Sequence, residues 1–410
     1  MKIIMGFIFL SHSLAALAVS FKSVLITAVN TYPTIIKENA QLESNKAKRL
    51  KAYSEFLPSI NLNSSKVENT SNGTKTDFSK NTITSQLNLF KFGSDIYNVK
   101  KQRLDYDKQV ANIKLEKHTI EEQISADLFS YLENVKTIGI HSKILALKKH
   151  ALAKAKKRYQ LGRLSKQDLD KIEIDHLNAE SNLSNKKILS LQLSQKVFEY
   201  TGEKKLDMDW PWDITFAQKL IRKLKTNLKF KHPSLEYTRF NEESAETNKK
   251  SIFGSMLGSL DLSYSKGHAE YNSGDIDDER VTLTFTIPLF SKFNDYSSLK
   301  ESQVIYQYAK AYNFYNKRKV ITNKHNSSLI LNEAIATFEK RKRTLVLSEK
   351  IYKNSLKQFA KGLISVNDLL FEEDRLLKTQ EFSITGNKSL HNAIVTFCHA
   401  NGKEVLTDCI

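Results

Sequence analysis

The sequence predicts a mainly α-helical fold with a small β part, in which a unit of one long helical hairpin and two β-strands occurs twice. Residues 94–202 indicate the hairpin, because they contain no proline and carry apolar residues at helical spacing. Landmark residues that recur at an offset of 200 positions indicate the duplication. Short segments in which apolar and polar residues alternate indicate four strands, two in each copy.

The first hairpin is predicted to reverse direction at residues 159–168. Gly162 offers the left-handed conformation that ends many helices. Ser165, followed three residues later by Asp168, is typical of an N-cap that starts the next helix. The outgoing arm of about 67 residues would span roughly 100 Å at ~1.5 Å per residue. No ordinary globular domain needs arms of that length.

The second copy repeats the landmarks of the first without a gap. The matched residues are Pro33 and Pro233, Leu57 and Leu257, Leu89 and Leu289, Phe90 and Phe290, Gly162 and Gly362, Ser165 and Ser365, Asp168 and Asp368, and Gly202 and Gly402. Identities at one fixed offset, placed at turns and strand ends, indicate a duplicated unit. We therefore expect a first repeat at 19–202, a linker at 203–231, a second repeat at 232–402 and a short tail at 403–410.

Residues 1–18 are expected to be an export signal. Lys2 supplies the positive start, residues 3–10 the apolar core, and Ala16 and Ala18 the small residues of a cleavage site. A buried N-terminal strand is the alternative. No later segment approaches the ~18 apolar residues of a membrane-spanning helix. An exported chain without such a helix would be located in the periplasm, in the outer membrane or outside the cell. The absence of a cysteine after the apolar core argues against a lipid anchor at the N-terminus.

The alternating segments favour strands that face a membrane on one side. In 82–89 the apolar side would carry Ile83, Leu87 and Leu89, and 259–264 and 281–289 alternate in the same way. In an exported chain, strands with apolar residues outward favour a membrane β-barrel, whose closure satisfies every backbone group. Four strands are too few to close a barrel, so several subunits would share one. A water-soluble sheet packed on the helices is the alternative, but it gives the long hairpins no purpose.

The chain is basic, with a net charge of +18, which raises nucleic acid as a partner. Lys and Arg are nevertheless interleaved with Asp and Glu along the predicted helices, and no aromatic-basic recognition module is visible. A solvated basic surface is therefore expected, with no nucleic-acid partner.

No catalytic, cofactor or metal constellation stands out in the sequence. The histidines are scattered, and His141 and His150 are nine apart rather than at helical ligand spacing. The acidic loop at 273–279 lacks the full pattern of a calcium loop and is expected to be a solvated surface loop. We predict that the protein is not an enzyme and has no cofactor.

Two smaller features are left open. Export permits a disulfide between Cys398 and Cys409, but the sequence does not establish one. Trp210 and Trp212, in the predicted linker, are expected to serve packing rather than to form an aromatic ligand box.

Taken together, the order of motifs resembles the TolC family of outer-membrane efflux and secretion channels. The motifs are a strand with Leu57-Pro58, a strand ending in Leu89-Phe-Lys-Phe-Gly93, the hairpin turn Tyr159-x-x-Gly-x-x-Ser-x-x-Asp-Leu169, and Thr284–Phe290. The same order recurs in the second copy, with Leu257, Leu289-Phe290 and Gly362-x-x-Ser-x-x-Asp-Leu369. The resemblance implies a homotrimer with a shared twelve-stranded β-barrel in the outer membrane of a Gram-negative bacterium, continued by a periplasmic tunnel of helices. It also implies outer-membrane lipid around the barrel, and a periplasmic adaptor and an inner-membrane transporter as partners. The linker would form a collar around the middle of the tunnel.

On this basis the predicted function is a passive export duct of a tripartite efflux pump or of a type I secretion system. A periplasmic coiled-coil scaffold or adaptor that never inserts into the membrane is the alternative. The sequence does not identify the cargo.

The candidate docking residues lie at the two hairpin tips. They are Leu161, Gly162, Leu164, Ser165, Gly362, Leu363, Ile364 and Ser365. Apolar residues at a place where the core is thin suggest a docking surface, although they also suit closure of the hairpin. 

Two acidic residues after the turns have two alternative roles. The resemblance implies that Asp368 lies at the periplasmic mouth of the tunnel, where three copies would make a negative constriction. Phe371 stands where a further acid would be expected one turn later, which departs from the family pattern. The local alternative is that Asp168 and Asp368 form capping pairs with Ser165 and Ser365.

Overall fold

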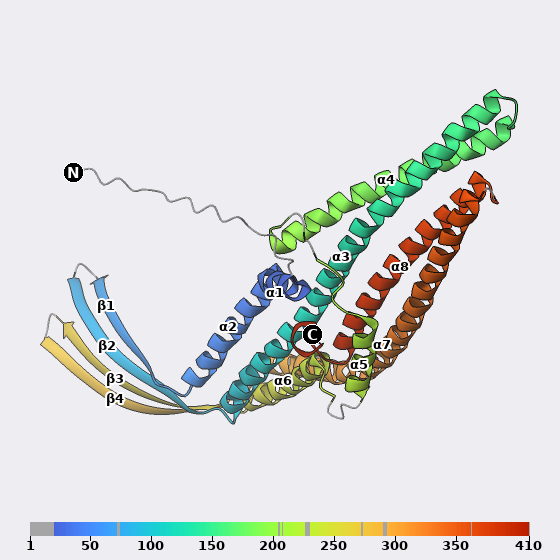
Figure 1. Ribbon diagram of the computed structural model, residues 1–410. Coiled ribbons are helices and arrows are strands. Elements are labelled where there is room, and N and C mark those ends of the chain that lie inside the picture. The colour runs from blue at the N-terminus through green and yellow to red at the C-terminus, as the bar shows by residue number, and fades with distance from the viewer. Residues whose placement is uncertain are drawn as a thin grey trace, which may run out of the picture. The chain divides into compact units, whose positions relative to one another are not determined.

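The computed structural model describes residues 20–71, 74–203, 206, 208–225, 230–271, 274–289, 293–361 and 363–409. The expected export signal at 1–18 lies outside the described residues, and so does Gly362. The elements in chain order are α1 (Phe21–Thr31), α2 (Pro33–Ser54), β1 (Ser59–Ser71), β2 (Thr74–Phe90), α3 (Ser94–Gln160), α4 (Lys166–Thr201), α5 (Ile214–Lys225), α6 (Pro233–Ser255), β3 (Ser259–Tyr271), β4 (Gly274–Thr286), α7 (Asn294–Ala360), α8 (Val366–Ala400) and the π-helical turn η1 (Val405–Cys409) (Figure 1). The predicted class, mainly helical with four strands, is confirmed.

The duplication is visible in the element boundaries. Helices α3 and α7 contain 67 residues each and begin 200 positions apart, at Ser94 and Asn294. Helices α2 and α6 and strands β1 and β3 begin at the same offset. The repeated order of helix, two strands and helical hairpin confirms the duplicated unit that the sequence predicts.

The compact units of the chain are not the sequence repeats. One unit comprises the residues up to 33 together with 117–230 and 323–410, and the other comprises 34–116 and 231–322. Each unit therefore contains part of both copies. The first holds the hairpin ends, and the second holds the sheet with its flanking helices.

In the second unit, the four strands form one antiparallel sheet in the order β1-β2-β3-β4. Its register places apolar residues opposite one another on one face. The apolar pairs are Leu62 with Ile83, Leu87 with Leu262, Leu262 with Leu283, Tyr264 with Val281, and Leu260 with Phe285. The other face pairs polar residues, such as Asn61 with Thr84. Every residue of β4 is exposed, so the chain itself leaves the apolar face of this strand uncovered.

A β-bulge corrects one detail of the predicted strands. The register of β2 on β3 shifts between Asn88 and Phe90, and Phe90 is the residue opposite Leu260. An extra residue in one strand moves the following side chains to the opposite face, so Phe90 takes the place on the apolar face that alternation assigns to Leu89. Strand β4 ends at Thr286, so the alternation predicted through Leu289 extends past the observed strand. The expectation of a surface loop at 273–279 is wrong for residues 274–279, which are exposed but form the start of β4.

In the first unit, an aromatic cluster joins the linker to α1, α3 and α8. Phe21 stacks on Phe129 with ring centroids 5.1 Å apart, and Trp212 stacks on His391 at 5.5 Å. The backbone N–H of Trp212 donates to Nε2 of His391 at 3.2 Å. Burial lowers the pKa of His391 to about 4, so the ring is neutral and accepts this bond at neutral pH. Trp212 therefore serves packing, as expected.

Among the residues that the structure describes, no helix combines the length and the apolar character needed to cross a membrane.

Candidate docking site at the hairpin ends

Both hairpins end with an equivalent helix-ending hydrogen bond. In the first, the N–H of Arg163 donates to the carbonyl of Arg158 at 2.8 Å, and the N–H of Gly162 donates to Tyr159 at 2.9 Å. Gly162 has φ +68°, the left-handed conformation that this helix-ending motif requires. In the second, the N–H of Leu363 donates to Gln358 at 2.9 Å, which is the equivalent of the first bond. 

Ser165 and Ser365 cap the helices that return from the turns. The backbone N–H of Asp168 donates to Oγ of Ser165 at 3.1 Å, and that of Asp368 donates to Oγ of Ser365 at 3.2 Å. In the second copy the N–H of Ser365 also donates to the Asp368 carboxylate at 3.0 Å, which completes a capping box. The serine cap is therefore present in both copies, and the reciprocal bond to the acid completes it in the second.

The caps affect the ionisation of both acids. Hydrogen bonds from the side chain and then the backbone of Ser365 lower the pKa of Asp368 below its usual value. Hydrogen bonds from Ser165 and then Lys171 lower the pKa of Asp168 in the same direction. Both carboxyls are therefore ionised at neutral pH, and each places its negative charge at a helix N-terminus, where the helix dipole favours it.

The four apolar tip residues divide into two pairs. Leu161 is 67% exposed and Leu363 is 70% exposed. Leu164 is half-buried and packs against a cluster of Leu152, Ala155 and Leu169, and Ile364 is likewise half-buried. Leu164 therefore helps to close its hairpin, and Leu161 and Leu363 are the apolar tip residues free to contact a partner.

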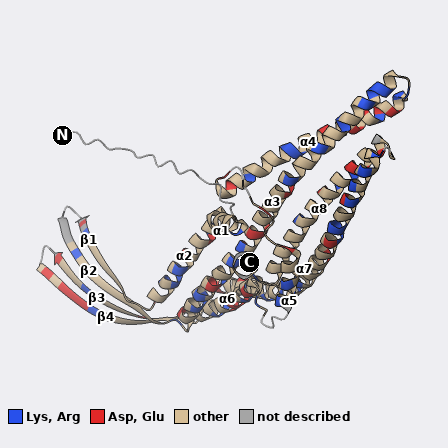
Figure 2. Cartoon of the chain, in the orientation of Figure 1, with Lys and Arg blue, Asp and Glu red and all other residues tan. Residues whose placement is uncertain are grey.

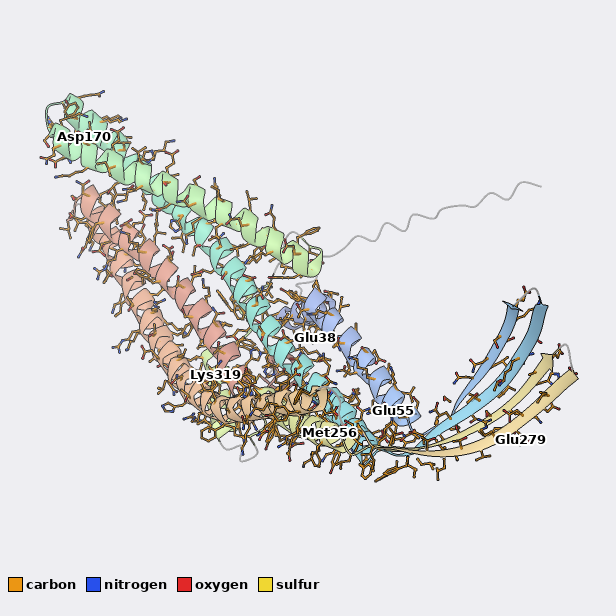
Figure 3. All side chains as sticks on the ribbon, turned by 180° about the vertical axis from the view of Figure 1, so that it is seen from behind. Glu38, Glu55, Asp170, Met256, Glu279 and Lys319 are labelled. Carbon is orange, nitrogen blue, oxygen red and sulfur yellow. A yellow bond between two sulfur atoms is a disulfide. The ribbon has the colours of Figure 1, made fainter. Side chains whose placement is uncertain are left out.

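The outgoing arm of the first hairpin carries an uninterrupted excess of positive charge. Residues 134–167 contain ten Lys or Arg and no Asp or Glu (Figure 2). The matching residues 334–367 contain eight Lys or Arg and two Glu. Part of this charge is neutralised by the returning helix, since Lys148 pairs with Asp175 at 3.1 Å. Asp170, at the end of the first hairpin (Figure 3), pairs with Lys166. The hairpin ends thus combine an exposed leucine with basic helices.

Within the described residues, no group of three or more His, Cys, Asp or Glu side chains is arranged to hold a metal ion.

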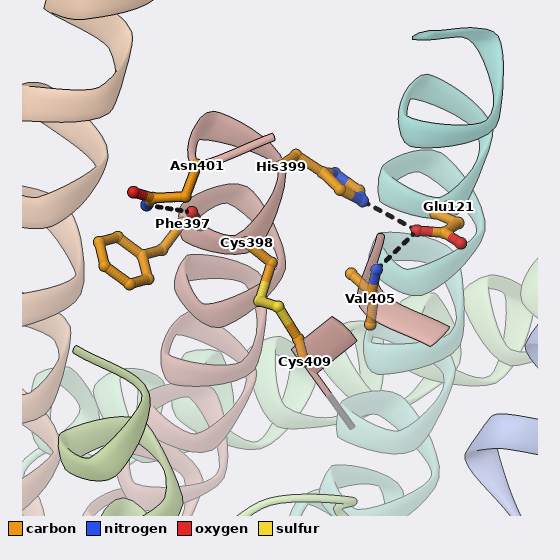
Figure 4. Close-up of a disulfide and its surroundings, with 7 residues drawn as sticks. All are labelled: Glu121, Phe397, Cys398, His399, Asn401, Val405 and Cys409. Carbon is orange, nitrogen blue, oxygen red and sulfur yellow. Dashed lines mark hydrogen bonds and ion pairs between the residues drawn. A yellow bond between two sulfur atoms is a disulfide. The ribbon is translucent and has the colours of Figure 1, made fainter. Parts of the chain in front are cut away.

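The structure resolves the open question about the cysteines. Cys398 and Cys409 form a disulfide that ties the residues after α8 back to that helix (Figure 4). The tail also reaches α3, because the N–H of Val405 donates to Oε2 of Glu121 at 3.0 Å. His399 is hydrogen-bonded to the same oxygen at 3.0 Å.

Sequence reasoning missed the polar contacts that hold α3 against α8. Besides Glu121 with His399, the pairs are Glu122 with Thr396, Glu133 with Lys388, and His141 with Glu381. Glu121 is only 1% exposed although it is ionisable. Its position between Ile120 and Ile124, on the apolar stripe of α3, was the signal that could have identified it, because an acid there must find partners.

The fold is similar to that of outer-membrane channel proteins of known structure. The chain is similar to the outer-membrane protein VceC from Vibrio cholerae, with a TM-score of 0.74 and 13% identity over 93% of this chain and 95% of that chain. It is similar to the CmeC outer-membrane channel of Campylobacter jejuni, with a TM-score of 0.76 and 11% identity over 93% and 85% of the two chains. It is also similar to the open state of the MtrE outer-membrane channel of Neisseria gonorrhoeae, with a TM-score of 0.76 and 10% identity over 95% and 90%. 

No protein-family model matches the sequence, and no curated protein matches it either. The likeness is therefore one of fold, and the chain has the TolC-like channel fold that the sequence motifs imply.

Proposed function

We propose that the protein is an outer-membrane export channel formed by three copies, whose sheets join into one twelve-stranded β-barrel continued by a periplasmic tunnel of helices. The observation that carries the proposal is the sheet. Its apolar face on β4 is exposed, with Val281 70%, Leu283 62% and Phe285 57% accessible. Its outer strands, β1 and β4, each have a neighbour on one side only. Lipid would cover such a face, and neighbouring copies would satisfy both edges.

The proposed channel acts as a passive duct and needs no catalytic residue or cofactor. Residues 1–18 would be removed on export, 19–202 and 232–402 would be the two repeats of each protomer, 203–231 would form a collar, and 403–410 would be a short tail. At the tips, the predicted docking surface would meet a periplasmic adaptor through Leu161 and Leu363, its exposed apolar residues, and the adaptor would link the duct to an inner-membrane transporter. The transporter would define whether the system is an efflux pump or a type I secretion system.

The alternative, a periplasmic scaffold that never inserts, would leave the apolar face of the sheet in water. An uncovered patch of this kind promotes aggregation in a soluble protein. The alternation of apolar and polar faces therefore favours insertion.

Adjacent residues on opposite faces of β4 provide a matched test. We expect Leu283→Lys to abolish recovery of the trimer from detergent-extracted outer membranes, because a lysine facing lipid near the bilayer centre costs about 2–4 kcal/mol. Thr284→Lys, on the polar face, should leave the trimer intact and change its conductance in planar bilayers. Recovery of the wild-type protein from soluble periplasm would contradict the proposal, and so would equal tolerance of both lysines.

The docking role of the tips is tested with Leu161→Ser combined with Leu363→Ser. Loss of export with an intact trimer supports docking, and Leu161→Met with Leu363→Met, which keeps an apolar tip, should retain export. Normal export by the serine variant would refute it.

A further inference from the structure

Basic residues recur every seven positions near the ends of both outgoing helices, at matched places in the two copies. They are Lys143, His150 and Lys157 in α3, and Arg343, Lys350 and Lys357 in α7. We call these six residues the basic line. A second row at the same spacing, Lys149, Lys156 and Arg163, has no basic counterpart in the other copy, where Glu349, Leu356 and Leu363 stand. His141 and Arg341 also match, but both are bonded within the chain, to Glu381 and to the carbonyl of Phe382. Seven-residue spacing combined with the match at all three positions therefore distinguishes the basic line.

All six residues of the basic line are exposed. Within the part of the chain that the structure describes, none of the six forms an ion pair. Lys148 and Lys156 behave differently, since they pair with Asp175 and Glu173 on α4. The fold thus uses the lysines that face the returning helix, and it leaves the basic side chains of the line available to another molecule.

The geometry of a helix turns this spacing into a straight row. Seven residues are close to two turns, so side chains at that interval stay on one face with a drift of only ~20° per heptad. On α3 this face lies opposite Leu152 and Ala155, which are buried. Three residues over fourteen positions make a row of roughly 21 Å along each helix at ~1.5 Å per residue. 

The direction of the row indicates the shape of the partner. A flat bilayer could touch only the end of a hairpin, whereas this row runs up its side. Charges at seven-residue spacing on the flank of a helix are the feature by which coiled-coil helices choose their partners. Next to the row, Leu347 is 51% exposed and offers an apolar contact.

We propose that the basic line binds an acidic α-helix of a partner protein, laid along the hairpin, with Asp or Glu at seven-residue spacing. The inference rests on the proposed function, in which the hairpin ends meet a periplasmic adaptor, and it adds the chemistry of the adaptor surface. Each carboxylate of the partner would face one basic side chain of the row.

The test uses a labelled synthetic helical peptide with Glu at every seventh position and a second peptide with Gln in those places. Binding to the detergent-purified full-length protein is measured by fluorescence anisotropy at low salt. The Glu peptide should bind at least tenfold more tightly than the Gln peptide. Replacing five residues of the basic line with Gln (Lys143, Lys157, Arg343, Lys350 and Lys357) should weaken binding of the Glu peptide at least tenfold. 

The matched control removes five exposed charges off the basic line: Lys149, Lys187, Lys342, Lys353 and Lys361, each changed to Gln. This control should bind within twofold of the wild type. Equal losses in both variants would reduce the effect to net charge and overturn the proposal, as would absence of binding to the wild type. Binding of phosphatidylglycerol vesicles that depends on the basic line would also overturn it, in favour of a lipid surface.

Conductance in planar bilayers separates this inference from the proposed function. The basic-line variant should conduct like the wild type, and a change confined to that variant would place the line in the pore and refute docking. If the wild type forms no channels, the proposed function fails, whereas the peptide measurement still decides whether the basic line binds an acidic helix.

Discussion

The two hairpin ends share a helix-ending hydrogen bond and a serine cap, and they differ in charge. Both turns contain the same helix-ending hydrogen bond and the same serine cap. Yet residues 148–175 contain nine Lys or Arg against four Asp or Glu, whereas 348–375 contain five of each. The turn admits few side chains, because one position needs φ > 0 and another needs a capping oxygen. Solvent-facing positions carry no such requirement, so duplication kept the turn while the charge diverged.

The ends of the two returning helices differ in another way. Helix α4 is capped by Gly202, whose N–H donates to the carbonyl of Phe198, and the chain continues into the linker. In the second copy Cys398 occupies the place of Phe198, and its disulfide holds the residues that follow. The same helix end is thus open in one copy and covalently closed in the other.

The largest expected effect concerns this disulfide. Replacing Cys398 and Cys409 with Ala should lower the free energy of unfolding by about 3 kcal/mol, from the loop entropy of a bond between residues 11 positions apart. Urea unfolding followed by circular dichroism measures this change. A reductant should lower the midpoint of the wild type and leave that of the variant unchanged. An unaltered wild-type midpoint under reducing conditions would show that the bond does not stabilise the fold.

A smaller effect is expected from the two leucines of the first turn. Leu164→Ser should destabilise the hairpin end by about 1–2 kcal/mol, because it removes a half-buried side chain from the cluster with Leu152 and Leu169. Leu161→Ser should have little effect on stability, since that side chain is exposed. Hydrogen exchange of the amides near Leu152 measures the local stability of both variants. Equal protection in the two variants would contradict the division of the tip residues into closing and exposed.

The caps should behave alike in both copies despite the difference in charge. Ser165→Ala and Ser365→Ala should each cost about 1 kcal/mol, because each leaves an N-terminal amide without its acceptor. The measurement is amide protection in the first turns of α4 and α8. If only one of the two variants loses stability, the two serine caps contribute unequally despite their shared geometry, which would contradict this prediction.

The pH dependence of these turns is expected to be smaller still. Because the folded pKa values of Asp168 and Asp368 are depressed, their contribution is present above the unfolded value of about 3.9 and is lost as pH falls through the lower folded value. Both first turns should therefore lose protection below about pH 4. About 1 M salt should weaken the first copy more than the second, because Lys171 assists the cap only in the first, whereas the helix dipole acts on the charge in both. Equal salt sensitivity of the two copies would contradict this distinction.

The smallest effect is expected for Asp368→Asn. Asparagine keeps a side-chain oxygen that can accept the Ser365 N–H and removes the charge. A capping role therefore predicts an unchanged single-channel conductance, and Asp168→Asn serves as the matched control in the other copy. A several-fold change in conductance for Asp368→Asn alone would identify that residue as part of a gate.

The features that the sequence predicts well are those with strict local requirements. The turns at Gly162 and Ser165 are examples, because few residues suit a left-handed C-terminus or an N-cap. The two faces of β4 were also predictable, because alternate residues of a strand point to opposite sides of the sheet.

The features that the sequence predicts poorly depend on distant partners. The bulge at Asn88 and Phe90 arises where β2 meets β3, so the face of Leu89 does not follow from alternation alone. Leu164 and Leu161 look equivalent in sequence, yet only Leu164 meets the cluster around Leu152. The disulfide likewise requires a chain reversal after α8 that two cysteines do not specify.

The equal length of α3 and α7 has a consequence for how this protein can evolve. Each contains 67 residues, about 100 Å of helix at ~1.5 Å per residue. A deletion in one helix alone would shorten one hairpin and leave the other unchanged, so the proposed threefold channel would acquire a stepped rim. If the proposed function holds, adaptation to a narrower periplasm would therefore require removal of the same number of residues from both copies. The duplication has in this way coupled the lengths of the two copies.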